Sequence, residues 1–314
     1  MFVSVVVPCY RSARTLPTLV GRLNEVLRAA ATAYEIILVV DSQDGTWEVA
    51  RDLALHGSPI QALRLARNYG QQNALIAGIR AARYDVIITI DDDLQHPPEE
   101  IPKLLAALTD DVDLVYALPD EEEHGIMRSL ASRIIKAGMS GAMGVRDARL
   151  LSAFRIFRTF LRGAFDNVSG PDVSVDVALS WATTRVGAVS VHMDDRTEGQ
   201  SGYTFRSLVR HAINMMLGYS TKPLRLVTYL GFLVGVGGLL LTVRVLWSYI
   251  AGGTTLAGYT TTASMIALFA SAQMIAIGVL GEYVGRIHGR GMGRPTYVIR
   301  ERTVAAEQRE DISG

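Results

Sequence analysis

The last third of the chain contains two long stretches without a charged residue. The first, residues 226–243, runs for 18 positions, and the second, residues 245–281, runs for 37. A helix that crosses the hydrocarbon core of a bilayer needs about 20 predominantly apolar residues. The pattern therefore predicts two membrane-spanning helices, at about 226–249 and 262–284, joined by the short turn AGGTTLAGYTTT. A helical hairpin buried in the core of a soluble protein is the alternative.

The charges around these stretches predict an orientation in the membrane. The connecting turn has no charged residue. Basic residues flank the pair of stretches on both sides: Lys222, Arg225, Arg286, Arg290 and Arg294. Because cytoplasmic flanks carry the excess of Lys and Arg, both ends of the hairpin are expected in the cytoplasm and the turn outside. Arg244 interrupts the first span near its outer end, where its long side chain can reach the interface. No basic signal-peptide region precedes the strand-like run that starts at Phe2, so the front of the chain is also expected in the cytoplasm.

Overall charge and cysteine content exclude some classes of partner and fold. The 31 basic residues balance the 31 acidic residues, so no overall positive field attracts nucleic acid. The one cysteine, Cys9, excludes an internal disulfide and is consistent with a reducing compartment.

The first 120 residues alternate short apolar runs with helical patterns. The runs are rich in β-branched residues and have little polar alternation: FVSVVV, EIILVV, IQALRL, DVIITI and DLVYAL. Between the first two, apolar residues recur at intervals of three and four, as on one face of a helix: Leu16, Leu19, Val20, Leu23, Val26 and Leu27. The pattern predicts an α/β domain with a doubly wound, mostly parallel sheet covered on both faces. In such sheets, ligands bind beyond the carboxyl ends of the strands.

Three consecutive acids follow one of these runs. In DVIITIDDDLQHPPEE, Asp91, Asp92 and Asp93 come directly after the apolar residues 86–90. A solvated turn, a metal site for a phosphorylated ligand and a paired acid–base site are three interpretations of such a cluster. Its position at the end of a buried strand favours the metal site, because Mg²⁺ and Mn²⁺ commonly bind one or two carboxylates together with substrate phosphates.

Two further segments have amphipathic patterns. In residues 126–143, Arg128, Ser132 and Lys136 fall on one helical stripe, and residues 204–219 mix basic and apolar side chains just before the first span. An ordinary surface helix and a helix at the bilayer interface are both consistent with the second pattern. The expected organisation is thus an α/β domain at 1–203, a juxtamembrane helix at 204–222, the two spans within 223–285 and a cytoplasmic tail at 286–314.

Five motifs in order carry a family resemblance: VSVVVPCYRSARTL, EIILVVDSQDGTW, LARNYGQQNALIAGI, VIITIDDDLQHPPE and DDRTEGQSGY. With the C-terminal hairpin, they make the whole chain resemble the family 2 inverting glycosyltransferases of GT-A fold. The similarity is greatest to the polyprenyl-phosphate glycosyltransferases. The resemblance implies an enzyme of the cytoplasmic membrane with a nucleotide-sugar donor, a polyprenyl-phosphate acceptor and a Mg²⁺ or Mn²⁺ cofactor. It also implies membrane lipid as a partner and a homo-oligomer, such as a tetramer.

The resemblance assigns roles to residues near the acids. Asp93 and Gln95 match the cation ligands of the family's D-x-D-L-Q motif, Asp91 matches the acid that binds the nucleotide sugar, and Asp92 takes the variable place between them. The remaining donor-binding residues match the family's P-x-Y motif and a second acid: Pro8, Tyr10 and Asp41.

The resemblance also implies an acceptor site. Arg128 and Ser132 match the Arg and Ser of the family's basic helix, and Arg196, Gly199 and Ser201 match an R-x-x-G-x-S segment. Arg128, Ser132, Arg196 and Ser201 are thus expected to bind the acceptor phosphate, and Asp93, Arg128 and Arg196 to form the catalytic set.

Two departures from the family pattern concern the nucleotide. Arg11 and Ser12 stand where many members have Asn-Glu, and the loop VDSQDGT is one residue shorter than usual. UDP is preferred to GDP as the donor nucleotide. The alternatives are a transferase that uses another membrane lipid hydroxyl, which would need a general base, and a non-catalytic scaffold that binds nucleotide sugars.

Overall fold

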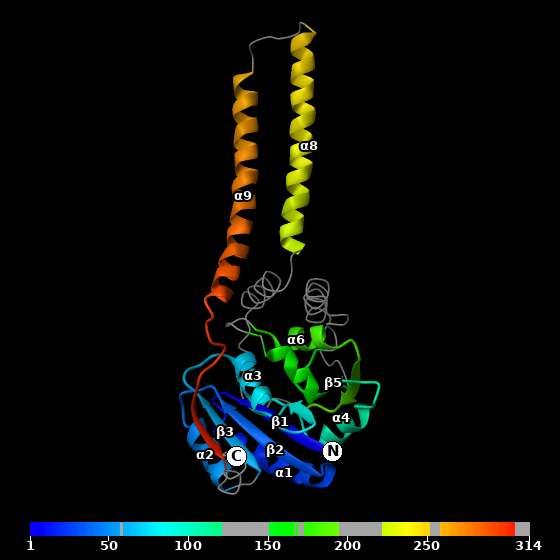
Figure 1. The fold of residues 1–314 in the computed structure, drawn as a ribbon, viewed down its shortest axis with the longest axis vertical. Coiled ribbons are helices and arrows are strands. Elements are labelled where there is room, and N and C mark those ends of the chain that lie inside the picture. The colour runs from blue at the N-terminus through cyan, green and yellow to red at the C-terminus, as the bar shows by residue number, and fades with distance from the viewer. Residues whose placement is uncertain are drawn as a thin grey trace. The chain divides into compact units, whose positions relative to one another are not determined.

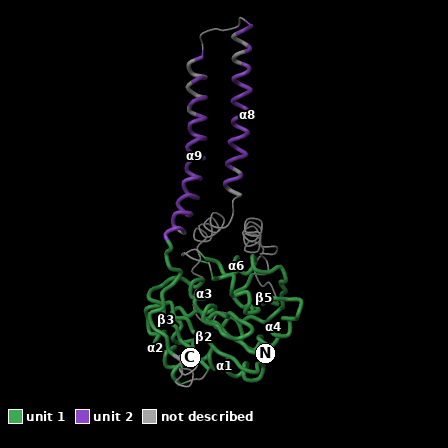
Figure 2. The backbone as a smooth tube through the Cα atoms, in the orientation of Figure 1, with its two compact units in different colours: residues 1–204, 293–314 green, residues 205–292 purple. Residues whose placement is uncertain are grey.

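The computed structural model describes residues 1–56, 59–120, 151–166, 168, 173–194, 222–251 and 258–304. The chain divides into two compact units, Met1–Thr204 with Gly293–Gly314, and Phe205–Met292 (Figure 2). The segments expected to form amphipathic helices, 126–143 and 204–219, lie outside the described residues.

Within the described residues, the first unit contains an eight-stranded sheet with the order β7-β5-β6-β4-β1-β2-β3-β8. Strands β1, β2 and β3 of this sheet are labelled in Figure 1. The strands are β1 (Phe2–Cys9), β2 (Ala33–Val40), β3 (Ile60–Leu65), β4 (Val86–Thr89), β5 (Leu114–Pro119), β6 (Arg155–Arg158), β7 (Val186–Val191) and β8 (Ile299–Val304). Pairs β1–β2, β1–β4, β2–β3 and β5–β7 are parallel, and the pairs made by β6 and β8 are antiparallel. The five apolar runs thus become β1 to β5, which confirms the predicted mostly parallel sheet.

Helices cover both faces of this sheet. They are α1 (Leu16–Ala30), α2 (Thr46–His56), α3 (Gln71–Ala81), η1 (Pro98–Glu100), α4 (Ile101–Ala107), η3 (Thr159–Phe165) and α6 (Val175–Ala182). Because successive strand side chains point to opposite faces, Val5 packs in one core with Leu23 of α1, and Val6 packs in the other with Leu75 of α3. Gly78 lets α3 approach β1 closely, since a Cβ there would lie 2.3 Å from Val6 Cγ1. Two buried cores hold the sheet, as a doubly wound fold requires.

Strand β8 comes from the segment that follows the apolar stretches, and the sequence did not predict it. It pairs antiparallel with β3, Arg64 Nη1 lies 2.9 Å from Glu301 Oε1, and the Ala66 N–H donates to the Val298 carbonyl at 2.9 Å. The sequence IRERTV contains three charged residues, which suit β8 because it is an edge strand of the sheet. Part of the expected tail at 286–314 therefore belongs to the sheet of the first unit.

The second unit contains two long helices, α8 (Lys222–Ile250) and α9 (Tyr259–Gly291). Each includes a window long and apolar enough to cross a membrane, Val227–Arg244 and Leu268–Gly289, and neither window is buried in the structure. A Cβ on Gly238 of α8 would lie 2.9 Å from Phe269 Cζ of α9, so the helices approach closely at this glycine. Exposed apolar side chains such as Phe232 and Trp247, each 74% exposed, argue against a hairpin buried in a soluble core.

Candidate active site

A cavity of about 400 Å³ lies at the carboxyl ends of β1, β2 and β4. Its lining residues come from these strand ends and from the start of α3: Pro8, Cys9, Tyr10, Asp41, Asn68, Gly70, Gln71, Ala74, Asp91, Asp92 and Asp93. The structure therefore brings together all five residues expected to bind the donor, and Asp93 with them. Their role as donor ligands stays a prediction.

Asp41, directly after β2, binds the loop that leads into α3. Its Oδ1 accepts the Tyr69 N–H at 2.7 Å and its Oδ2 accepts the Gly70 N–H at 2.6 Å. Burial raises the pKa of Asp41, against the effect of these two backbone donors. Asp41 thus shapes the cavity wall by holding the loop between β3 and α3.

The start of α3 adds residues that sequence reasoning did not assign. The Gln71 side chain donates through Nε2 to Asp91 Oδ1 at 2.7 Å, and Asn68 and Gly70 also line the cavity. Gly70 has φ +89°, a left-handed conformation that glycine adopts without steric cost. The signal was present in the motif LARNYGQQNALIAGI, which joins a strand to a helix, but only the fold shows that this junction faces the acids.

Asp92 connects the acids to the turn after β1. Its Oδ2 accepts the Tyr10 N–H at 2.8 Å, and its backbone carbonyl accepts the Thr15 hydroxyl at 2.8 Å. Arg11, between these two donors, has φ +56°, which is uncommon for a residue other than glycine. Burial, with the neighbouring charges of Asp91 and Asp93, raises the pKa of Asp92 to about 6. Asp92 therefore stabilises a strained turn at the cavity mouth.

The expected cation ligands, Asp93 and Gln95, differ in their position relative to the cavity. Asp93 lines the cavity, whereas Gln95 is not among the lining residues, and the Gln95 N–H donates to Asp93 Oδ1 at 3.2 Å. Within the described residues, no group of three His, Cys, Asp or Glu side chains could hold a metal ion. The oxygens of Asp91 and Asp93 fit Mg²⁺ or Mn²⁺ as a partial ligand set, which substrate phosphate oxygens would complete.

The segment after β7 meets the acidic loop. The Asp194 N–H donates to the Gln95 carbonyl at 3.0 Å. Arg22 of α1 binds Glu99 through two hydrogen bonds of 2.9 and 2.7 Å, and its Nη2 lies 3.6 Å from Asp194 Oδ2. These contacts hold Asp194 beside the loop that carries Asp93.

The residues expected at the acceptor site lie outside the described residues: Arg128, Ser132, Arg196, Gly199 and Ser201. Their roles stay predictions.

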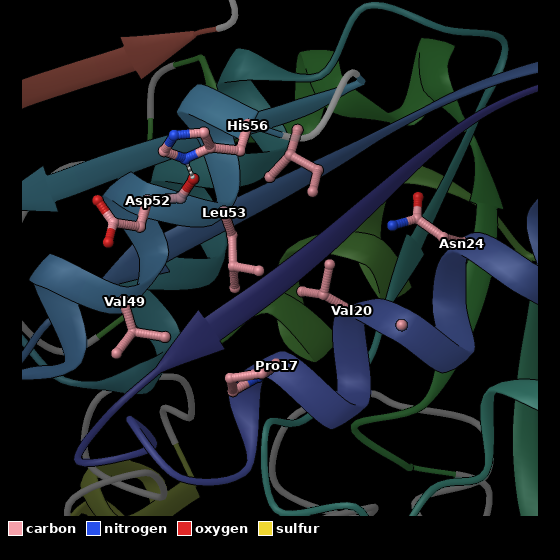
Figure 3. Close-up of a pocket in the computed structure, with 9 residues that line it drawn as sticks. Pro17, Val20, Asn24, Val49, Asp52, Leu53 and His56 are labelled. Atoms are coloured by element: carbon pink, nitrogen blue, oxygen red, sulfur yellow. Dashed lines mark hydrogen bonds between the residues drawn. The ribbon is translucent and has the colours of Figure 1, made fainter.

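A second hollow, of about 490 Å³, lies between α1 and α2 (Figure 3). Val20, Leu53 and Ile60 give it an apolar lining, and its His56 is bonded through Nδ1 to the Asp52 carbonyl at 2.9 Å. Ile60 begins β3, so this hollow extends to the amino end of a strand. It lacks the clustered carboxylates of the first cavity.

The doubly wound sheet with acids at its carboxyl edge defines a GT-A-type domain. Residues 4–168 match the model of glycosyl transferase family 2, and residues 222–287 match the GtrB C-terminal hairpin. The first match covers more than half of the chain, which therefore belongs to glycosyl transferase family 2.

Curated relatives match nearly the whole length. An undecaprenyl-phosphate 4-deoxy-4-formamido-L-arabinose transferase of Yersinia enterocolitica is 32% identical over 313 residues, which cover 98% of this chain and 95% of the relative. The enzyme of the same name from Aeromonas hydrophila is 31% identical over 314 residues, with 98% and 96% covered.

Solved structures share the fold of the first unit. Glucosyl-3-phosphoglycerate synthase of Mycobacterium tuberculosis, in complex with Mn²⁺, UDP and glucosyl-3-phosphoglycerate, has a TM-score of 0.52 at 18% identity. The match covers 69% of this chain and 79% of that one. The same enzyme with Mn²⁺ and UDP-glucose has a TM-score of 0.51 at 17% identity.

Proposed function

We propose that this protein transfers a sugar, with inversion, from a UDP-sugar to polyprenyl phosphate at the cytoplasmic face of a membrane. The observation that carries the proposal is the cavity at the carboxyl ends of β1, β2 and β4, lined by three consecutive acids. The hairpin α8–α9 would anchor this cavity to the lipid phase that holds the acceptor. The names of the relatives support polyprenyl phosphate as the acceptor.

The donor would bind in the cavity with its diphosphate near Asp91 and Asp93. A Mg²⁺ or Mn²⁺ ion held by Asp93, with Asp91 and Gln95 as further oxygen ligands, would neutralise the charge that develops on the departing diphosphate. The Gln71 amide orients the Asp91 carboxylate, and Asp41 holds the loop that closes the pocket on the α3 side.

A phosphate acceptor removes the need for a general base. The second pKa of a phosphate monoester is about 6, so at pH 7 the acceptor is largely a dianion and can attack without giving up a proton. It instead needs cationic groups that bind it beside the leaving diphosphate. Arg128 and Arg196 would supply them, since Arg binds phosphate in a bidentate manner.

The direct experiment supplies labelled nucleotide sugars to membranes that contain the protein. Undecaprenyl phosphate is added in one arm and diacylglycerol in the other. We expect a labelled, mild-acid-labile lipid only with undecaprenyl phosphate, and the most product with a UDP-sugar. Product with diacylglycerol alone would support transfer to a lipid hydroxyl. Nucleotide-sugar binding without any product would support the non-catalytic scaffold.

A further inference from the structure

Residues 90–95, which carry the acids and are here called the metal loop, begin at a clamp between β4 and β6. Thr89, the last residue of β4, pairs with Arg155, the first residue of β6. The Thr89 hydroxyl donates to the Ala153 carbonyl at 2.7 Å and accepts the Arg155 Nε–H at 3.0 Å. The β4–β6 ladder ends at this pair, so the clamp lies where the metal loop leaves the sheet.

The other end of the metal loop returns to the same place. His96 directly follows the loop, and its ring centroid lies 5.4 Å from that of Phe154, the residue before Arg155. The exposed fraction is 8% for His96 and zero for Phe154. The two residues that flank the metal loop, Thr89 and His96, thus contact two consecutive residues, Phe154 and Arg155.

The charged side chain of Arg155 is buried, with only 1% of the residue exposed, and it has partners there. Its guanidinium forms an ion pair with Asp176 of α6, and the Tyr116 hydroxyl donates to the same Asp176 oxygen at 3.0 Å. A buried charge is tolerated where it is paired and hydrogen-bonded, and it then has one favoured position. This network fixes Arg155 against α6 as well as against β4.

We propose that Phe154 and Arg155 are positioning residues for the metal loop, an inference that rests on the proposed metal-dependent transfer. Neither residue is among those that line the cavity. By holding Thr89 and His96, they set the positions from which Asp91 and Asp93 offer their oxygens to a cation. Residues that orient metal ligands in this indirect way typically change metal affinity or activity by about 10- to 100-fold when substituted.

The test measures Mn²⁺ binding to the full-length protein in detergent with saturating UDP, from the electron paramagnetic resonance signal of free Mn²⁺. Phe154→Leu and Arg155→Lys should each raise the Mn²⁺ dissociation constant about 10-fold or more. Thr89→Val removes only the hydroxyl between the strands, and it should also weaken Mn²⁺ binding. This variant keeps the test decisive if the Arg155 variant does not fold.

Phe157→Leu is the matched control. Phe157 lies on β6, three residues after Phe154, and is also fully buried, but it packs in the other core, with Ile87 and Leu114. It should lower the melting temperature much as Phe154→Leu does and leave Mn²⁺ affinity unchanged. Equal Mn²⁺ affinity in all four variants and the unsubstituted protein would overturn the positioning role. If the unsubstituted protein binds no Mn²⁺ with UDP, the proposed metal function fails, and this inference fails with it.

Discussion

The three consecutive acids differ at the level of the single residue because each has different partners. Asp91 accepts from Gln71, Asp92 from the Tyr10 N–H and Asp93 from the Gln95 N–H. Asp92 connects the cluster to the turn after β1. Substitutions at these adjacent positions should therefore have separable effects.

Asp93→Asn should abolish turnover, because it removes a charged ligand of the expected cation. Asp92→Asn should be milder, since an amide oxygen can still accept the Tyr10 N–H. Asp92→Ala loses that acceptor and should weaken UDP binding, as the turn after β1 is released. Initial rates against Mn²⁺ concentration, beside calorimetric UDP binding, separate the three. Full activity of Asp93→Asn in EDTA-treated membranes would contradict the metal assignment.

The arginines of the expected acceptor site give a second prediction at this scale. Arg128→Ala and Arg196→Ala should each weaken the interaction with polyprenyl phosphate about ten- to a hundredfold, the effect of losing a charge-assisted bond of about 1.5–3 kcal/mol. Donor binding should stay nearly intact. Initial rates at varied acceptor concentration measure the first effect and calorimetry measures the second.

Arg128→Lys and Arg196→Lys should each retain only part of the interaction with polyprenyl phosphate, because lysine lacks the planar, bidentate guanidinium of arginine. If donor affinity collapses while the dependence on acceptor is unchanged, these arginines act on the diphosphate instead.

Among the elements, β8 shows how a late segment contributes to an early sheet. It covers the edge of β3 and adds the ion pair between Arg64 and Glu301 and the hydrogen bond between Arg302 and Gln61. Without it, β3 would present unpaired backbone groups at an exposed edge.

Removal of residues 299–314 should therefore destabilise the first unit. A loss of about 2 kcal/mol or more, from the ladder and the ion pair, corresponds to a fall in melting temperature of roughly 4–8 °C for a domain of this size. Intrinsic fluorescence of the buried Trp47 can report the transition. Removal of residues 305–314 alone leaves β8 in place and should have little effect. Equal melting temperatures for the two truncations would show that β8 does not stabilise the sheet.

At the scale of the whole molecule, the chain leaves the first unit before α8 and returns to it after α9. Gly293–Gly314 belongs to the same compact unit as Met1–Thr204. In the two-span arrangement that we propose for α8 and α9, both segments would therefore lie on the same side of the membrane. Together with the basic flanks, this supports a hairpin with both ends in the cytoplasm.

Cysteine labelling in intact cells tests this orientation, in a background with Cys9 replaced by alanine. A cysteine at Thr255, in the turn between the two spans, should react with an impermeant maleimide from outside. A cysteine at Ala305 should react only after the membrane is permeabilised. The reverse pattern would contradict the proposed orientation.

The sequence by itself determined the elements that follow from a local pattern of side chains. Runs of β-branched residues predicted β1 to β5, the recurrence from Leu16 to Leu27 predicted α1, and the length of the uncharged stretches predicted α8 and α9. The strand β6 was missed because it is only four residues long and begins at the buried Arg155, whose charge is accommodated by Asp176 from a distant helix.

Contacts between distant segments were decided only by the tertiary structure. Asp41 and Gly70, Gln71 and Asp91, and Thr89 and Arg155 are separated by 29, 20 and 66 positions, yet each pair is hydrogen-bonded. The order and register of the strands bring them together, and no local period encodes that order. The sequence alone therefore predicted acids at the end of a strand, whereas the tertiary structure determined which residues hydrogen-bond to each of them.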